Sequence, residues 1–247
     1  MTVLLALDSS TDVMALALVG PGGTRYFEAA GGAQASARLV PEALALLGQA
    51  GLRLVDVDAI AFGRGPGAFT GLRTACAVVQ GLAFGAAKPV LAIDSLMIVA
   101  EDARQQALAA GAPLAGLIWV AMDARIGEIY AAAYRHDGEA WLTVSVPALY
   151  SPADLVARWA VQPEVHQAVA GSALTVFADQ LGALPRAWPA SASRAGALAV
   201  LAATAWARGE ARDAAEALPT YVRDKVALTT AERMEARAAS ALQMASP

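Results

Sequence analysis

The stretch LLALDSST, residues 4–11, and the later stretch LIWVAMDAR, residues 117–125, decide the fold. Each is a short apolar run that ends in an aspartate, Asp8 in the first and Asp123 in the second, with a turn after it. Short apolar runs bounded by turn residues are typical of buried strands. Because the same unit occurs twice, the sequence predicts two copies of one supersecondary structure.

The residues that follow the first copy predict a mixed sheet with helices on its faces. Three apolar segments joined by short turns are typical of an antiparallel meander, and strand–helix units come after them. Thr70 and Ser95 are the expected N-caps of two helices, and Pro41 predicts a late start or a kink in a third. The expected strands are 3–7, 13–19, 24–29, 57–62 and 89–93, and the expected helices are 36–50, 70–85 and 95–110.

The second copy repeats this order. Asp137-Gly138 is a hairpin signal between two of its strands, and Gly171-Ser172 is expected to open a helix. The expected strands are 117–122, 127–134, 140–146 and 167–170, with further helices at 151–159 and 193–208. We therefore expect an α/β fold of two domains, residues 1–110 and 111–247, with helix 193–208 joining the first. Residues 218–224 have extended character.

Composition excludes several classes of protein. The chain has 247 residues, of which 57% are hydrophobic, so it can bury a sizeable core, and wholesale disorder is excluded. A net charge of −4 argues against gripping nucleic acid by bulk charge. With one cysteine and two histidines, an intrachain disulfide is impossible, and a structural zinc site has too few ligands. No signal peptide or membrane-spanning stretch is recognisable, so a cytoplasmic protein is expected.

The turn after the first strand could bind phosphate. Backbone N–H groups and the hydroxyls of Ser9, Ser10 and Thr11 are phosphate ligands, and Asp8 could hold a hydrated Mg²⁺, with Asp123 facing it across a cleft. The alternative is an Asx or ST turn that only closes a hairpin. Neither loop has the glycines that let a backbone approach a triphosphate, so the sequence predicts at most a degenerate nucleotide cleft.

The glycine-rich loop GRGPGAFTG, residues 63–71, lies between a strand and a helix, as a phosphate loop would. It is not a Walker A motif, because no lysine follows, so we favour a rigid turn whose glycines allow close packing. No catalytic set is apparent either. Cys76 lies among apolar residues and is interpreted as a core residue, while His136 and His166 are expected to lie on the surface.

The helix TGLRTACAVVQGLAFG, residues 70–85, is apolar all round. A helix of this kind is buried on both sides, so we expect one side to meet the sheet and the other to meet a second chain. The alternative is that the C-terminal segments of this chain cover it. The residues expected at such an interface are Leu39, Leu46, Leu47, Ala77, Val78, Gly81 and Phe84.

Four segments together resemble the bacterial TsaB (YeaZ) family: LLALDSST, GRGPGAFTGLRTACAVVQGLAFG, DARIGEIYAA and LPTYVRDKVA. They occur in order from Leu4 to Ala227 and span nearly the whole chain, and the GRGPGAFTGLR block is the most specific of them. The pattern departs at Ala35-Ser36, where relatives often have a histidine before the serine.

The resemblance implies a two-domain actin-like fold of the sugar kinase and heat-shock ATPase superfamily. It implies a non-catalytic partner of TsaD, which transfers threonylcarbamoyl to the adenosine beside the anticodon of ANN-decoding tRNAs. TsaD would bind through N-terminal helices, the ATPase TsaE would dock on that pair, and tRNA would be met only through the complex. No cofactor is implied for this chain itself, although ATP or ADP and Mg²⁺ could bind at the complex interface. The chain alone could form a homodimer.

Two rival functions stay open at this point. The first is a small-molecule kinase or ATPase of the same superfamily that uses Asp8 and Asp123 around Mg²⁺-ATP. The second is a hydrolase that acts on TsaD itself. Short length, glycine-poor phosphate turns and the lack of an evident base argue against the kinase.

Overall fold

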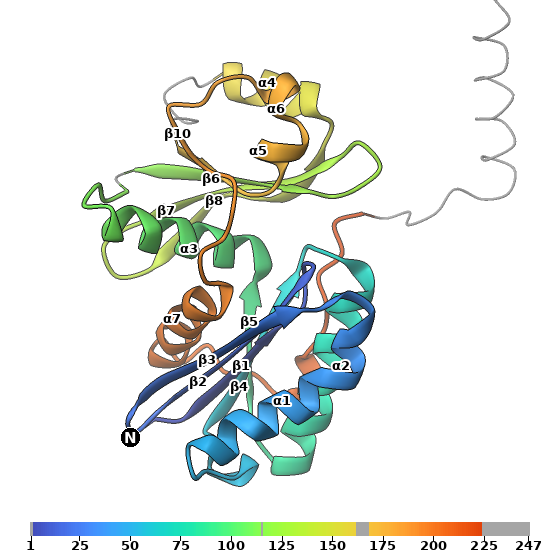
Figure 1. Ribbon diagram of the computed structural model, residues 1–247, viewed down its shortest axis with the longest axis vertical. Coiled ribbons are helices and arrows are strands. Elements are labelled where there is room, and N and C mark those ends of the chain that lie inside the picture. The colour runs from blue at the N-terminus through green and yellow to red at the C-terminus, as the bar shows by residue number, and fades with distance from the viewer. Residues whose placement is uncertain (1, 115, 162–167, 224–247) are drawn as a thin grey trace, which may run out of the picture.

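The computed structural model describes residues 2–114, 116–161 and 168–223, which form two five-stranded sheets with helices around and between them (Figure 1). The first sheet has the strand order β3-β2-β1-β4-β5. Its first three strands are antiparallel, as the meander predicts, and β4 and β5 run parallel to β1. The strands are β1 (Leu4–Asp8), β2 (Val13–Gly20), β3 (Gly23–Ala30), β4 (Ala59–Gly65) and β5 (Val90–Asp94).

The second sheet has the order β8-β7-β6-β9-β10, which is the order of the first sheet strand for strand. The duplication predicted from the two apolar runs is therefore confirmed by the strand topology. The three residues of β10 were not predicted, because so short a strand carries no apolar pattern of its own. The strands are β6 (Leu117–Asp123), β7 (Ile129–His136), β8 (Trp141–Tyr150), β9 (Ala168–Ala170) and β10 (Arg186–Trp188).

The helices form three layers around the sheets (Figure 1). On one face of the first sheet lie α1 (Ala35–Gln49) and α2 (Phe69–Ala86). Between the two sheets lie α3 (Ser95–Ala109) and α7 (Arg194–Ala207). The outer face of the second sheet is covered by α4 (Pro152–Ala160), α5 (Ala173–Val176) and α6 (Ala178–Leu181). Short 3₁₀ turns are η1 (Gly32–Gln34), η2 (Leu54–Asp56) and η4 (Ala214–Glu216).

Alternate residues of β1 serve two different cores. Leu5 and Leu7 pack with α1 and α2, whereas Leu4 and Ala6 pack with α3, α7 and the second sheet. A strand covered on both faces must be apolar at every position, which explains why β1 is a continuous apolar run.

Two local predictions about helix starts are wrong, and one of the two alternatives predicted for Pro41 is excluded. The N-cap of α2 is Ala68 rather than Thr70, and no side chain caps it. The N-cap of α3 is Asp94 rather than Ser95, because the Asp94 carboxylate accepts a hydrogen bond from the Leu96 N–H at 2.9 Å. Pro41 lies inside α1, which already begins at Ala35, so the predicted late start does not occur. The other predicted alternative, a kink, stays a prediction.

The chain returns to the first sheet after completing the second. Helix α7 packs on β1, β2, β3 and β5 and on α3. The Glu28 carboxylate of β3 accepts a hydrogen bond from the Ala195 N–H at 2.7 Å, which places an anion at the N-terminus of α7. The Asp102 carboxylate of α3 accepts a hydrogen bond from the Ser193 N–H, also at 2.7 Å. Both contacts anchor the start of α7 between the sheets.

Residues 208–223 run back along the first domain. Arg212 pairs with Val90 at the edge of the first sheet, and Ala214 and Ala217 enter the core beneath α1 and α2. The Thr220 N–H then donates to the Arg64 carbonyl oxygen at 2.7 Å. The expected extended segment has no regular structure over 218–223, and Asp224 lies outside the described residues. Among the described helices, none is long and apolar enough to cross a membrane.

Candidate functional site

The glycine-rich loop packs against the turn that follows β1. A Cβ atom on Gly63 would overlap the Asp8 carboxylate, and a Cβ atom on Gly71 would overlap the Ser9 carbonyl oxygen. A Cβ atom on Gly67 would likewise overlap the carbonyl oxygen of Ser10. Only glycine permits so close an approach at these three positions, to backbone at Gly67 and Gly71 and to the carboxylate at Gly63. The glycines therefore hold two turns together, which is the role that we favoured over a phosphate cradle.

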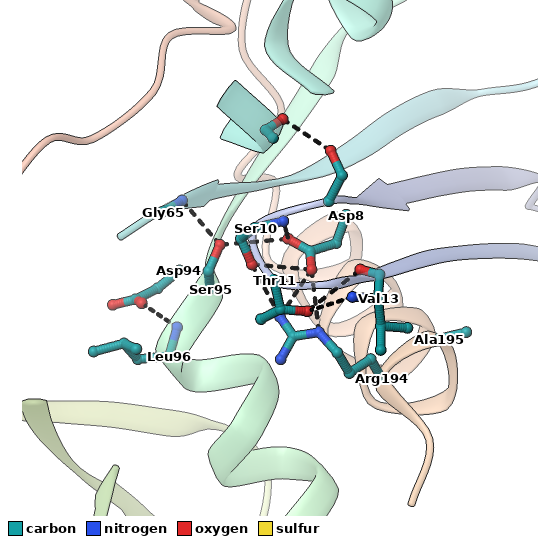
Figure 2. A network of polar contacts seen from close by, with 12 residues as sticks. Asp8, Ser10, Thr11, Val13, Gly65, Asp94, Ser95, Leu96, Arg194 and Ala195 are labelled. Carbon is teal, nitrogen blue, oxygen red and sulfur yellow. Dashed lines mark hydrogen bonds and ion pairs between the residues drawn. The ribbon is translucent and has the colours of Figure 1, made fainter. Parts of the chain in front are cut away.

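Asp8 forms a buried ion pair with Arg194 (Figure 2). The Arg194 Nη2 and Nε atoms lie 2.8 and 3.2 Å from Asp8 Oδ2, and the Ser10 hydroxyl donates to the same oxygen at 3.0 Å. The Ser95 hydroxyl donates to Asp8 Oδ1 at 3.5 Å and accepts the Gly65 N–H at 2.9 Å. The carboxylate is 0% exposed and the Arg194 side chain 3% exposed. The negative charge of Asp8 is thus balanced by the positive charge of Arg194.

Arg194 and Ser95 are the members of this network that sequence reasoning missed. Arg194 lies 186 residues from Asp8 along the chain, so no local spacing connects the two. One signal was present: Arg194 directly precedes a long run of apolar residues in α7 and is itself buried there. A charged residue at such a position needs a partner of opposite charge.

Asp123 occupies the corresponding position at the end of β6 and has a different partner. Its carboxylate accepts the Arg125 N–H at 2.8 Å, and the Arg125 Nη1 atom lies 3.4 Å from it. The Ser172 hydroxyl accepts the Asp123 N–H at 3.1 Å. The Nη2 atom of Arg125 reaches across to the Asp12 carboxylate of the first domain at 3.0 Å. The Asp123 carboxylate is therefore bonded to Arg125 of its own turn. Arg125 also forms an exposed ion pair with Asp12 of the first domain.

A cavity of about 420 Å³ lies between the two domains. Of the five residues predicted to form a nucleotide cleft, Ser10, Thr11 and Asp123 line it, and Asp8 and Ser9 do not. The Ser9 hydroxyl instead donates to the Gly71 carbonyl oxygen at 2.8 Å. Aromatic and apolar side chains contribute much of the wall, among them Phe69, Leu72, Leu96, Met122, Tyr130 and Tyr221.

These residues do not fit a magnesium nucleotide held through Asp8. The guanidinium of Arg194 contacts the oxygen that a metal would need, and a cation already bonded there repels a second one. The glycines whose backbone could approach a phosphate pack against the turn after β1 instead. Within the ranges that the structure describes, no group of three or more His, Cys, Asp or Glu side chains is placed to hold a metal ion.

The exposed side of α1 and α2 differs in part from the predicted interface. Leu39, Leu46 and Leu47 are 0%, 3% and 1% exposed, so these three predictions are wrong. The apolar stripe of α1 faces the sheet, and Leu44 lies on the opposite side, 48% exposed. On α2, Phe84 is 59% exposed. We call the solvent side of the two helices the α1–α2 surface; it consists of Ala37, Pro41, Leu44, Gly48, Ala77, Gly81 and Phe84, with Val78 half-buried at its edge.

The C-terminal segment covers a different side of α2. Ala214 and Ala217 pack in the core that contains Cys76, Val79 and Ala83. The alternative that this chain shelters its own helix is therefore right for one side of α2. On the other side of α2, Phe84 is 59% exposed, and no segment within residues 208–223 packs over it. Residues 224–247 lie outside the described residues, so for that side the alternative stays open.

Cys76 is buried, and burial raises the pKa of its thiol to about 11. A raised pKa leaves little thiolate near neutral pH, and thiolate is the reactive form. We expect iodoacetamide at pH 8 to modify Cys76 at least about 100-fold more slowly in the native protein than in urea. Mass spectrometry of quenched samples measures this, and equal rates in both states would contradict the buried assignment.

Of the two histidines, His136 lies among the described residues, where it packs in a turn. His136 lies edge-on against Trp141 with ring centroids 5.1 Å apart, and its Nδ1 accepts the Gly138 N–H in the β7–β8 turn. Partial burial lowers its pKa. His166 lies outside the described residues.

Comparison with known proteins places the chain in a family. The family model described as "TsaD: tRNA N6-adenosine threonylcarbamoyltransferase" matches residues 30–246. A Haemophilus influenzae protein named "tRNA threonylcarbamoyladenosine biosynthesis protein TsaB" is 39% identical over 127 residues, which cover 51% of each chain. The Escherichia coli protein of the same name is 36% identical over 135 residues, which cover 54% of this chain and 55% of that one. The chain thus spans about half the length of the curated relatives it matches.

The structural likeness extends further along the chain. The structure titled "YeaZ from Pseudomonas aeruginosa" superposes with a TM-score of 0.77 at 38% identity, and it covers 90% of this chain and 100% of that one. The chain therefore belongs to the family that the TsaD model describes and, within it, to the TsaB (YeaZ) members, with their two-domain actin-like fold.

Proposed function

We propose that this chain is a non-catalytic subunit of tRNA threonylcarbamoyladenosine biosynthesis that binds TsaD through the α1–α2 surface. In this role it supports TsaD during threonylcarbamoyl transfer to the adenosine beside the anticodon of ANN-decoding tRNAs. The names of the H. influenzae and E. coli relatives support the pathway. The observation that carries the binding role is the exposed apolar α1–α2 surface.

The α1–α2 surface has the character of a helix-packing interface. Leu44 and Phe84 are large apolar side chains that are 48% and 59% exposed, and the other residues of the surface are small. On α2, Ala77, Gly81 and Phe84 recur at intervals of four and three residues, so they share one side of the helix. Small residues let another helix approach closely, and the large ones supply apolar area to bury.

The rest of the assembly follows from the same proposal. TsaE would dock on the pair of TsaD and this chain, and tRNA would be met through the complex in the cytoplasm. ATP or ADP with Mg²⁺ would bind at the interface of the complex, and this chain itself would need no cofactor. Without TsaD, the exposed α1–α2 surface would favour a homodimer, because an apolar surface can pair with its own copy.

The proposal is tested by co-purification with the TsaD of the same genome. Phe84→Arg and Leu44→Arg each place a charge on the surface at one of its two large apolar side chains, and we expect each to weaken association at least about 30-fold, a hot-spot effect. Leu47→Arg is unsuitable, because Leu47 is buried. Val146→Arg is the matched control, since Val146 is 70% exposed on β8 of the other domain. Unchanged association in both surface variants would falsify the proposed binding surface.

The rival kinase or ATPase makes a different prediction. If Asp8 and Asp123 held Mg²⁺-ATP, titration calorimetry of the isolated chain would show binding in the low micromolar range that Asp123→Asn weakens. We expect no such binding, because Asp8 is neutralised by Arg194. The hydrolase alternative predicts cleavage of TsaD, and intact-mass analysis of the mixed proteins would reveal it.

A further inference from the structure

Arg73 lies at one end of the α1–α2 surface. It precedes Ala77 by four residues on α2 and therefore lies on the same side of the helix as Ala77, Gly81 and Phe84. Its side chain is exposed, and no carboxylate among the described residues forms a salt bridge with it. A cation near the N-terminus of a helix gains nothing from the helix dipole, so helix stability does not account for it.

The guanidinium of Arg73 is held in place by two aromatic rings. Its Cζ atom lies 3.8 Å from the centroid of the Phe69 ring, and its Nε donates to the Tyr221 hydroxyl at 3.1 Å. The two rings contact each other, with centroids 5.0 Å apart. These contacts occupy one face and the Nε edge of the guanidinium. They leave the Nη1 and Nη2 atoms without a hydrogen-bond partner among the described residues.

Tyr221 is itself anchored to both domains by its neighbours in the chain. The Thr220 N–H bonds to Arg64 of the first domain, and Arg223 forms an ion pair with Glu128 of the second at 2.6 Å. The ring that positions Arg73 is thus fixed on both sides. A guanidinium positioned in this way has already lost much of its rotamer freedom, so an anion that binds it costs less side-chain entropy.

We propose that Arg73 is a specificity residue of the TsaD interface, where its two Nη atoms bind a carboxylate of the partner. This inference rests on the proposed function and identifies the partner group that the α1–α2 surface would select. A paired fork of N–H donors matches a carboxylate in bidentate geometry. The apolar residues that follow Arg73 along α2 suit a protein helix better than RNA, and the net charge of −4 also disfavours RNA.

The test measures association and dissociation rates of the full chain with TsaD over a range of salt concentrations. Arg73→Gln is expected to weaken binding about 30-fold or more, mainly through faster dissociation, and to flatten the salt dependence. Arg73→Lys keeps the charge but loses the fork, so it should recover only part of the affinity. Arg73→Glu should be rescued by one Asp→Arg or Glu→Arg variant of TsaD, which identifies the carboxylate.

Arg158→Gln is the control, because Arg158 is exposed on α4 in the other domain. Thermal unfolding of each variant confirms that the fold is intact. If Arg73→Gln binds TsaD as tightly as the unmodified chain, the inference is overturned while the proposed function stands. If the complex with Arg73→Gln forms normally but binds tRNA with a salt slope reduced by about one, Arg73 contacts a phosphate instead. If the unmodified chain does not bind TsaD, both proposals fail.

Discussion

Replacing Arg194 with alanine is expected to lower the free energy of unfolding by about 3–5 kcal/mol, because it leaves a buried carboxylate without its counter-charge. Asp8 is 0% exposed, so in the unmodified fold its carboxylate has no solvent contact that would compensate for the lost guanidinium. The hydroxyls of Ser10 and Ser95 remain, but neutral donors compensate an ionised carboxylate less well than a cation does. Urea unfolding at neutral pH measures the change.

The control for Arg194→Ala is Arg208→Ala. Arg208 pairs with Glu210 at 3.0 Å, and both side chains are 50% exposed. An exposed pair of this kind contributes at most about 1 kcal/mol, so the control should stay close to the unmodified protein. A further variant, Asp8→Asn with Arg194→Leu, removes both charges together and should be more stable than either single change. Equal losses for Arg194→Ala and Arg208→Ala would contradict the buried ion pair.

The second large effect is expected at Gly71. A Cβ atom there would overlap the Ser9 carbonyl oxygen, and backbone cannot move aside as a flexible side chain can. Gly71→Ala should therefore cost about 3 kcal/mol or more of unfolding free energy, at the upper end of overpacking effects. The change should also loosen the turn that holds Asp8, since the Ser9 hydroxyl bonds to the Gly71 carbonyl.

Gly81 offers a matched control on the same helix. No atom lies within 4 Å of a Cβ built on Gly81, so alanine fits there without strain. Gly81→Ala should raise the unfolding free energy of the isolated chain by up to about 1 kcal/mol, through helix propensity alone. Thermal and urea unfolding of the two variants should thus move in opposite directions. A similar result for both would mean that the glycine loop does not pack on the turn as described.

Much of the fold could be predicted because its signals are local. The strands β1 and β6 are apolar runs that end at aspartates, and the β7–β8 turn carries Asp137-Gly138. The duplication followed from comparing the two runs. Where the signal was short or shared by neighbours, prediction failed: β10 has three residues, and Asp94 was overlooked as the cap of α3 because Ser95 is also a capping residue.

The α1–α2 surface shows where periodicity stops being informative. Helical spacing identifies a stripe of leucines on α1. Because the opposite side of the helix carries alanine and glycine, the spacing does not show whether the leucines face the sheet or a second chain. Leu39, Leu46 and Leu47 are buried against the sheet, whereas Leu44 is exposed. On α2, Ala77, Gly81 and Phe84 are exposed, as a contact with a second chain would require, because Leu72, Cys76 and Val79 already define the sheet side.

By itself the sequence determined all the described strands except β10, the repeated unit and the family resemblance, since apolar runs, turn residues and motif spacing act over a few neighbouring positions. Only the tertiary structure decided the role of Asp8, because its partner Arg194 reaches it from a helix 186 residues away. The same is true of Arg73, whose Nε atom is held by a tyrosine 148 residues further along the chain. Electrostatic partnership acts through space, and a linear pattern does not encode which charges the fold brings together.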